Sequence, residues 1–167
     1  MSQENNSSKN QKENTENKIS YVDPRIYLSE IERIIQDGKE VVIPVSGGSM
    51  SPFLVGGRDY VMLEKAVIYR LKKGDIVLYQ RENGQFVLHR IWKIKRKKFY
   101  MIGDGQSKAE GPVGQEKIRA VVSKIKRKGK WIEKKSFWEY FFRIVWIRII
   151  PFRGNIRRYW RKVKRNR

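Results

Sequence analysis

The 167-residue sequence contains no cysteine and only one histidine, His89. The lack of cysteine excludes a disulfide framework and any thiolate metal site. One histidine cannot build a site from several imidazoles, and no HExxH or DxD pattern supports a carboxylate-rich metal site. We therefore expect neither a metal nor another cofactor, and His89 is the one imidazole available for acid–base chemistry.

Long apolar runs are also missing. Residues 1–20 are polar and lack the apolar run of a secretory signal, and we expect residues 1–22 to form a disordered tail. No run of about 18 uncharged apolar residues suggests a conventional membrane-spanning helix. These absences predict a protein that is cytoplasmic or peripherally associated with a membrane.

Positive charge, by contrast, is abundant. The chain has 38 Lys and Arg against 17 Asp and Glu, for a formal net charge of +21. Residues 124–167 alone hold 17 of the basic residues and two Glu. An excess of this size indicates an anionic partner, either nucleic acid or an acidic membrane surface.

Hydrophobic patterning divides the rest of the chain. A helix is expected within residues 23–38, because Asp23 and Pro24 suit a helix start, Gly38 suits its end and apolar residues recur at helical spacing between them. Residues 39–130 read as a mostly β domain, and 131–167 as a basic aromatic tail with helical character. The expected strands lie at 41–45, 60–63, 76–79, 86–94, 99–102 and 118–125.

Three residues of the β domain can carry chemistry together. Ser49 follows two glycines, which permit a tight backbone that presents the hydroxyl. A serine hydroxyl needs a base to become a nucleophile, and His89, on an expected strand, can act as that base. Asp104 lies in a Gly-Asp-Gly turn and can orient the imidazole. Each feature alone also fits a purely structural role, so the prediction rests on their combination.

The segment around Ser49 resembles a known motif. Residues 45–52 read VSGGSMSP and resemble the nucleophile box of the S24/S26 serine peptidases, which join signal peptidases with self-cleaving LexA-type and phage repressors. The box is followed by GRDYV, LKKGDIV, VLHRI and YMIGD, so the resemblance covers about residues 40–122. It implies a signal-peptidase/LexA-like β fold and peptide-bond hydrolysis.

The residue at position 89 distinguishes the branches of this group. Bacterial signal peptidases and repressors place a lysine there, whereas histidine followed by Arg-Ile is similar to the endoplasmic-reticulum and sporulation type. The resemblance therefore implies that Ser49 is the nucleophile and His89 the general base. The acidic residue that orients His89 is either Asp104 or Glu110, and the resemblance leaves this choice open.

The oxyanion and the substrate should contact the turn around Ser49. Many signal peptidases have a serine two residues before the nucleophile, but this chain has Gly47. We therefore expect the oxyanion to bind the Ser49 N–H, assisted by Ser46. The residues expected to form the oxyanion and substrate-binding surface are Ser46, Gly47, Gly48, Met50 and Pro52.

The basic aromatic tail suits an interface. Residues 137–150 are too few to span a bilayer as a helix, which needs about 20, and they contain Glu139, Arg143 and Arg148. Their aromatic side chains suit the headgroup level, and the basic run that follows suits anionic lipid. We therefore favour contact of residues 137–167 with an anionic membrane. The alternatives are packing on the β domain and binding of nucleic acid.

Together these features predict a serine endopeptidase that cleaves a precursor or leader peptide by a Ser–His mechanism. With an unperturbed imidazole, activity should rise near pH 6.5. Two alternatives are a non-catalytic module of the same fold that binds peptide or membrane, and a basic nucleic-acid-binding protein.

Overall fold

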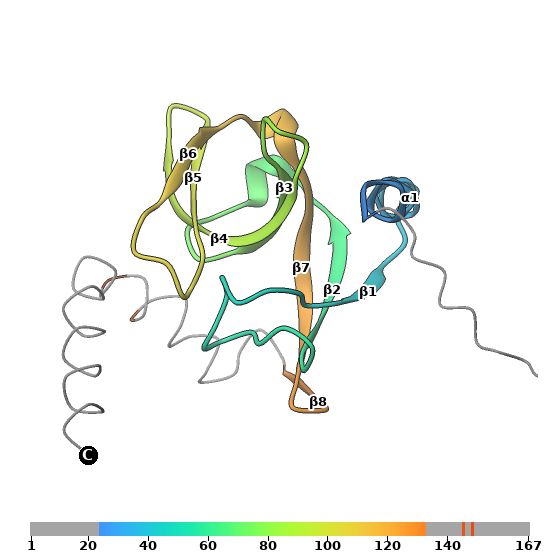
Figure 1. Cartoon of the computed structure of the whole chain (residues 1–167). Coiled ribbons are helices and arrows are strands. Elements are labelled where there is room, and N and C mark those ends of the chain that lie inside the picture. Colours follow the sequence, from blue (N-terminus) through green and yellow to red (C-terminus); the bar gives the residue numbers. More distant parts are fainter. Residues whose placement is uncertain (1–23, 133–144, 146–147, 149–167) are drawn as a thin grey trace, which may run out of the picture.

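The computed structural model describes residues 24–132, Val145 and Arg148. One sheet of eight antiparallel strands and an N-terminal helix make up this part of the chain (Figure 1). The prediction of a mostly β fold with an N-terminal helix is therefore confirmed. The expected polar tail and nearly all of the basic aromatic tail lie outside the described residues. Among those described, no helix combines the length and apolar character needed to cross a membrane.

The strands do not follow one another in the sheet in chain order. Their order is β1-β2-β7-β3-β4-β5-β6, and β8 pairs with β7 outside this path. Two short 3₁₀ helices, Ile68–Arg70 and Gln115–Lys117, lie in connections. The elements are α1 (Pro24–Gln36), β1 (Val41–Pro44), β2 (Tyr60–Lys65), β3 (Ile76–Gln80), β4 (Phe86–Lys95), β5 (Lys98–Ile102), β6 (Glu110–Val113), β7 (Ile118–Arg127) and β8 (Lys130–Ile132).

Helix α1 ends where the sequence predicts. Gly38 has φ = 81°, and its N–H donates to the Ile35 carbonyl while the next amide donates to that of Ile34. This is a Schellman motif, which satisfies carbonyls that the end of a helix leaves open. Ile31 and Ile35 are buried against the sheet, and burial of each contributes roughly 1.5–3 kcal/mol before entropic costs. The helix therefore has a fixed place beside β1 and β2.

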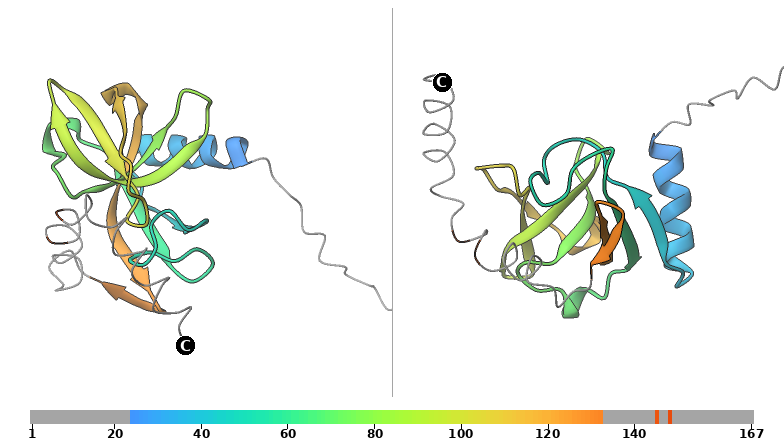
Figure 2. Two further views of the ribbon diagram at one scale, coloured as in Figure 1. Left: turned by 60° about the vertical axis from the view of Figure 1, so that its left-hand side comes forward. Right: turned by 90° about the horizontal axis from the view of Figure 1, so that it is seen from below.

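Strand β3 is buried on both faces. Ile76 and Leu78 pack in one hydrophobic cluster, which also includes residues of α1, β1 and β2. Val77 and Tyr79 point to the other face, into a second cluster with residues of β4, β5 and β7. The strands curl around this second cluster, so that β6 comes back toward β3 although two strands separate them in the sheet (Figures 1 and 2). This curl brings β6 side chains close to the end of β3.

Two strands were not predicted from the sequence. β6 contains Gly111 and Pro112, which are poor strand residues and restrict it to a sheet edge. β8 has three residues, too few for a periodic pattern. Through β8 the sheet continues to Ile132, past the domain boundary expected at residue 130.

Candidate active site

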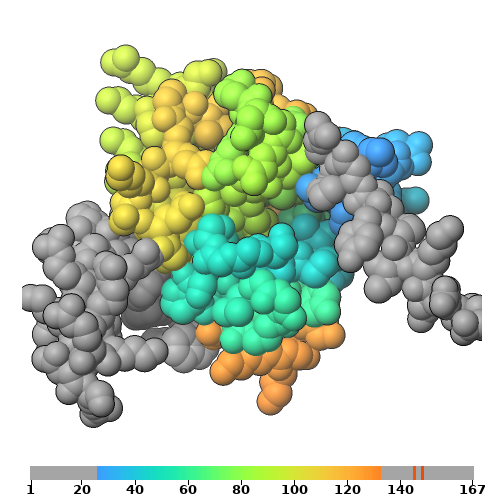
Figure 3. Space-filling view, in the orientation of Figure 1, coloured from blue at the N-terminus to red at the C-terminus, as the bar shows by residue number. Residues whose placement is uncertain are grey.

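Ser49 lies in the long connection between β1 and β2. Gly47 there has φ = 71°, a conformation that side chains with a Cβ rarely adopt. The Ser49 carbonyl accepts a hydrogen bond of 2.8 Å from the Gly105 N–H, which fixes the turn against the segment after β5. The hydrogen bonds between described residues leave the Ser49 N–H and hydroxyl unused. In Figure 3 this connection lies at the surface, beside the β3–β4 hairpin and the β5–β6 segment.

Gly103 shows how closely Ser49 and His89 approach. A Cβ placed on Gly103 would lie 2.4 Å from the Ser49 carbonyl oxygen and 3.1 Å from His89 Nε2. The Ser49 backbone and the His89 imidazole are therefore neighbours, and both pack on Gly103. A side chain at position 103 would force one of them to move.

One cavity of about 500 Å³ is lined by both Ser49 and His89. The structure therefore brings together the two residues that the sequence pairs, although they come from the β1–β2 connection and from β4. Ser46, Gly47, Gly48 and Met50, which the sequence predicts to contact the substrate, line the same cavity. Pro52 does not; it is exposed, and its carbonyl accepts a 3.4 Å hydrogen bond from Arg127.

The imidazole of His89 is held at Nδ1. The side chain is fully buried, and Nδ1 lies 3.2 Å from the Tyr79 hydroxyl, which donates a 2.6 Å hydrogen bond to Glu110 Oε2. A tyrosine hydroxyl has one hydrogen, so Nδ1 must donate to its oxygen. We assign the tautomer protonated at Nδ1, which leaves the lone pair on Nε2.

The other ring nitrogen is unpaired. Across residues 24–132, His89 Nε2 has no hydrogen-bond partner, so the Ser49 hydroxyl does not donate to it in this arrangement. Catalytic hydrogen bonds are often long without substrate and tighten when it binds. A buried acceptor without a partner carries a desolvation cost that a suitably placed donor removes.

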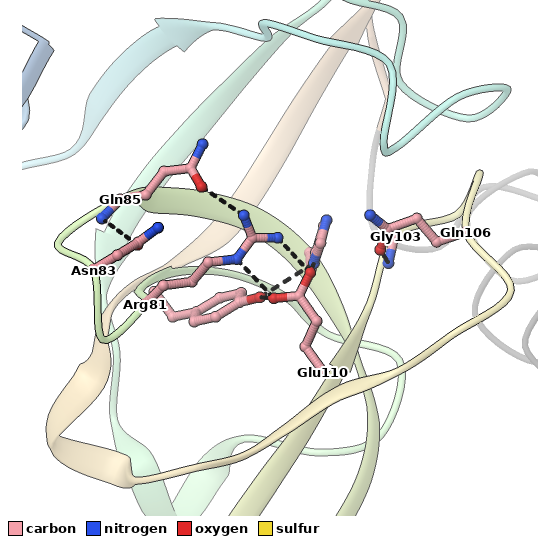
Figure 4. Close-up of polar contacts among 8 residues, drawn as sticks. Arg81, Asn83, Gln85, Gly103, Gln106 and Glu110 are labelled. Carbon is pink, nitrogen blue, oxygen red and sulfur yellow. Dashed lines mark hydrogen bonds and ion pairs between the residues drawn. The ribbon is translucent and has the colours of Figure 1, made fainter.

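Arg81 binds the carboxylate of Glu110, which Tyr79 connects to His89. Its Nε donates to Glu110 Oε2 at 2.8 Å, and its Nη2 contacts Oε1 (Figure 4). The hydrogen bond from Arg81, helped by that from Tyr79 and opposed by burial, lowers the Glu110 pKa. Burial, and then the hydrogen bond to Glu110, raise the pKa of Tyr79. Glu110 is therefore ionised and Tyr79 protonated at neutral pH.

Burial lowers the pKa of His89 to about 4. Arg81 adds to this effect, while the negative charges of Glu110 and Asp104 oppose it. His89 is therefore neutral across the physiological range, which a general base requires. The expected rise of activity near pH 6.5 assumed an unperturbed imidazole, and with this lower pKa the expectation for such a rise shifts to lower pH.

Asp104 has a different main partner. Its two carboxylate oxygens accept hydrogen bonds of 3.0 and 2.9 Å from Arg90 Nε and Nη2, and Arg90 Nη1 donates to the Gly74 carbonyl at 2.9 Å. Both side chains are about 1% exposed. Of the two acidic residues that the sequence leaves open, Glu110 is the one that hydrogen bonds join to His89 Nδ1 through a single hydroxyl.

Sequence reasoning missed Tyr79 and Arg81. A signal for Tyr79 existed: β3 and β4 are joined through an Asn-Gly turn, and their register pairs Val77 with His89. Tyr79 lies two residues farther along the same face, which makes it a diagonal neighbour of the histidine. Arg81 could not be found this way, because it acts through β6, a strand the sequence did not reveal.

Comparisons with known families, proteins and structures find no match: no family model, curated protein or solved structure matches this chain.

Proposed function

We propose that this protein is a serine endopeptidase that hydrolyses a peptide bond with Ser49 as nucleophile and His89 as general base. The observation that carries the proposal is the shared cavity: Ser49 lines it together with a buried histidine whose Nε2 has no partner. The low pKa of His89, which keeps the imidazole neutral, supports the same role.

The chemistry requires few groups. The Ser49 hydroxyl attacks the carbonyl carbon of the substrate, and its proton moves to His89 Nε2. The Ser49 N–H, which no described residue uses, donates to the oxyanion. His89 returns the proton to the leaving amine. A water molecule, deprotonated by the same nitrogen, then attacks the acyl carbon; the bond to the Ser49 oxygen breaks, and His89 returns the proton to that oxygen.

The substrate is an extended segment of a precursor or leader peptide, as the resemblance to signal peptidases implies. The cavity suits a peptide backbone flanked by apolar side chains, because Ile43, Leu78 and Leu88 line it beside Ser49. It offers glycines at 47 and 48, where a chain can approach the backbone closely.

Labelling with a serine-directed phosphonate tests this function without a known substrate. We expect the wild-type protein to be modified at Ser49, and the Ser49→Ala and His89→Ala variants to remain unmodified. Ser51→Ala is the matched control, since Ser51 is half-buried in the same turn but does not line the cavity. Peptide mapping by mass spectrometry locates the label. A wild-type protein that stays unmodified, or is modified equally without His89, contradicts the proposal.

A non-catalytic peptide-binding module is the second candidate. The missing hydrogen bond between Ser49 and His89 favours it, since a site built only to bind needs none. Candidate precursor peptides that bind the wild type and Ser49→Ala equally, with neither protein cutting them, would establish this alternative.

We also propose that residues 137–167 attach the protein to an anionic membrane surface. The support is the sequence of this segment together with the β7–β8 hairpin before it, where Lys128 and Lys130 are exposed and Lys126 lies over the ring of the exposed Trp131. Flotation with vesicles containing phosphatidylserine should recover the full chain but not a chain ending at residue 134. Flotation that does not differ between the two chains contradicts membrane attachment, and salt-sensitive RNA or DNA binding that needs the segment would instead favour nucleic acid.

A further inference from the structure

The hydrogen bonds behind His89 form a continuous chain from β4 through β3 to β6. Arg81 donates to Glu110, the Tyr79 hydroxyl donates to Glu110, and His89 Nδ1 lies within hydrogen-bonding distance of that hydroxyl. An ionised carboxylate can only accept, so the Tyr79 hydrogen must point to Glu110. The oxygen of Tyr79 is then the acceptor that Nδ1–H meets.

We propose that Tyr79 is the positioning residue of this site, and that its hydroxyl transmits the orienting effect of Glu110 to His89. The proposal rests on the proposed function, because it assigns the group that prepares the general base. It replaces the direct histidine–carboxylate contact of a serine-protease triad with a histidine–tyrosine–carboxylate chain.

Distance argues against direct orientation by Glu110. The Glu110 Oε1 atom lies 3.8 Å from His89 Nδ1, too far for a hydrogen bond, whereas the Tyr79 hydroxyl lies between them in bonding order. Asp104 is engaged on both oxygens by the buried Arg90. The described residues therefore offer Nδ1 one well-placed acceptor, and it is the tyrosine oxygen.

Arg81 determines in which direction these hydrogen bonds are donated. The hydrogen bonds from Arg81 keep Glu110 ionised, and an ionised Glu110 keeps the Tyr79 hydrogen on its own side. Without that carboxylate, the hydroxyl could turn and donate to Nδ1. The imidazole would then carry its proton on Nε2, and Nε2 could no longer accept the proton of Ser49.

The arrangement also serves the charged intermediate. When the O–H bond of Ser49 breaks and an N–H bond forms on Nε2, the imidazolium keeps its Nδ1–H···O bond to Tyr79. No proton moves to the tyrosine or to Glu110. The negative charge of Glu110, which acts to raise the His89 pKa, stabilises the cation as it forms.

Nitrogen-15 NMR of the full chain tests the assignment without any enzymatic assay. Since the protein has one histidine, labelled imidazole gives the signals of His89 alone. At pH 7 we expect the wild type to show a protonated Nδ1 and an unprotonated Nε2. In Tyr79→Phe, which keeps the packing of the ring, the Nε2–H tautomer should become a major form. Tyr60→Phe, at an exposed tyrosine of β2, should behave as wild type.

Glu110→Ala is a second variant that interrupts the same series of hydrogen bonds. It frees the Tyr79 hydrogen to donate to Nδ1, so it should shift the tautomer in the same direction as Tyr79→Phe. Unchanged tautomer populations in both variants, with circular dichroism showing both folded, would overturn the proposal. This outcome does not depend on whether Ser49 is ever labelled.

The rate of phosphonate labelling links the tautomer to the proposed function. Loss of the orienting carboxylate in a serine-protease triad costs about 10⁴-fold, and we expect Tyr79→Phe to lose roughly 10- to 1,000-fold because Ser49 and the oxyanion donor remain. The loss should appear in the maximal labelling rate and not in the phosphonate concentration that gives half of it. If the wild type is unlabelled but its tautomer responds to Tyr79, the proposed function fails and the positioning role remains. If Ser49 is labelled and Tyr79→Phe does not slow the labelling, the positioning role of Tyr79 is wrong but the proposed function stands.

Discussion

Two arginine–carboxylate pairs lie near His89, and they differ in how far they are exposed. Arg90 and Asp104 are about 1% exposed, and the arginine also donates to a backbone carbonyl. Arg81 and Glu110 are about 30% exposed and connect through Tyr79 to the imidazole. The first pair is enclosed by the fold, whereas the second ends in the candidate active site.

Because of this difference, we expect the first pair to affect mainly stability and the second to affect mainly the state of His89. Removing one partner of a buried ion pair strongly destabilises the fold, because the other charge stays buried without compensation. A partly exposed pair contributes little to stability but can set the state of a neighbouring group. Variants of Asp104 and of Glu110 should therefore differ in stability and in Ser49 labelling.

The largest effect is expected at the buried pair. Asp104→Ala leaves the Arg90 guanidinium buried without its carboxylate and should cost about 3–5 kcal/mol of unfolding free energy. Urea unfolding followed by circular dichroism measures the loss. A cost below about 1 kcal/mol would mean that the buried pair does not support the fold any more than the exposed pair does.

The pH dependence of stability should reflect His89. The folded-state pKa of His89 is about 4 and its ordinary value is 6.5, so the unfolded chain binds the proton more readily between these values. The contribution of the neutral His89 to the free energy of unfolding is therefore complete above pH 6.5. It is lost as the pH falls toward 4, and the total loss is about 3 kcal/mol.

Urea unfolding between about pH 5.3 and 6.5 measures part of this effect above the range where ordinary carboxylates titrate. His89→Gln should remove most of the slope. An equal slope in the wild type and in this variant would mean that the histidine is not held neutral by burial.

The smallest effect on stability is expected at the exposed pair. Glu110→Gln keeps the shape of the side chain, and we expect it to cost no more than about 2 kcal/mol. The same variant should slow phosphonate labelling of Ser49 at least about tenfold, because Tyr79 loses an ionised acceptor. A variant as unstable as Asp104→Ala, or one with wild-type labelling, would remove the distinction between the pairs.

Much of the architecture could be predicted from the sequence, because local signals were strong. Pro24 and Gly38 bound α1 as expected, and six of the eight strands fall at their predicted places. The strands that were missed are β6, which carries Pro112, and the three-residue β8. Neither has the alternation on which a strand prediction depends.

The pairing of Ser49 with His89 could be predicted from the sequence, but the groups that surround His89 could not. Ser49 and His89 lie in recognisable motifs, and they line one cavity. The choice between Asp104 and Glu110 depended on where two arginines point, and no spacing in the sequence encodes that. Tyr79 went unnoticed because it is an apolar core residue in every respect except its hydroxyl.

The pH profile of Ser49 labelling shows whether His89 accepts the proton of Ser49. If a buried, neutral His89 is the general base, the wild-type labelling rate should stay constant from about pH 5 to 8 and fall to half near pH 4, the pKa of the imidazole. A rate that instead rises through pH 6.5 or higher, or a profile that His89→Ala leaves unchanged, would contradict the account.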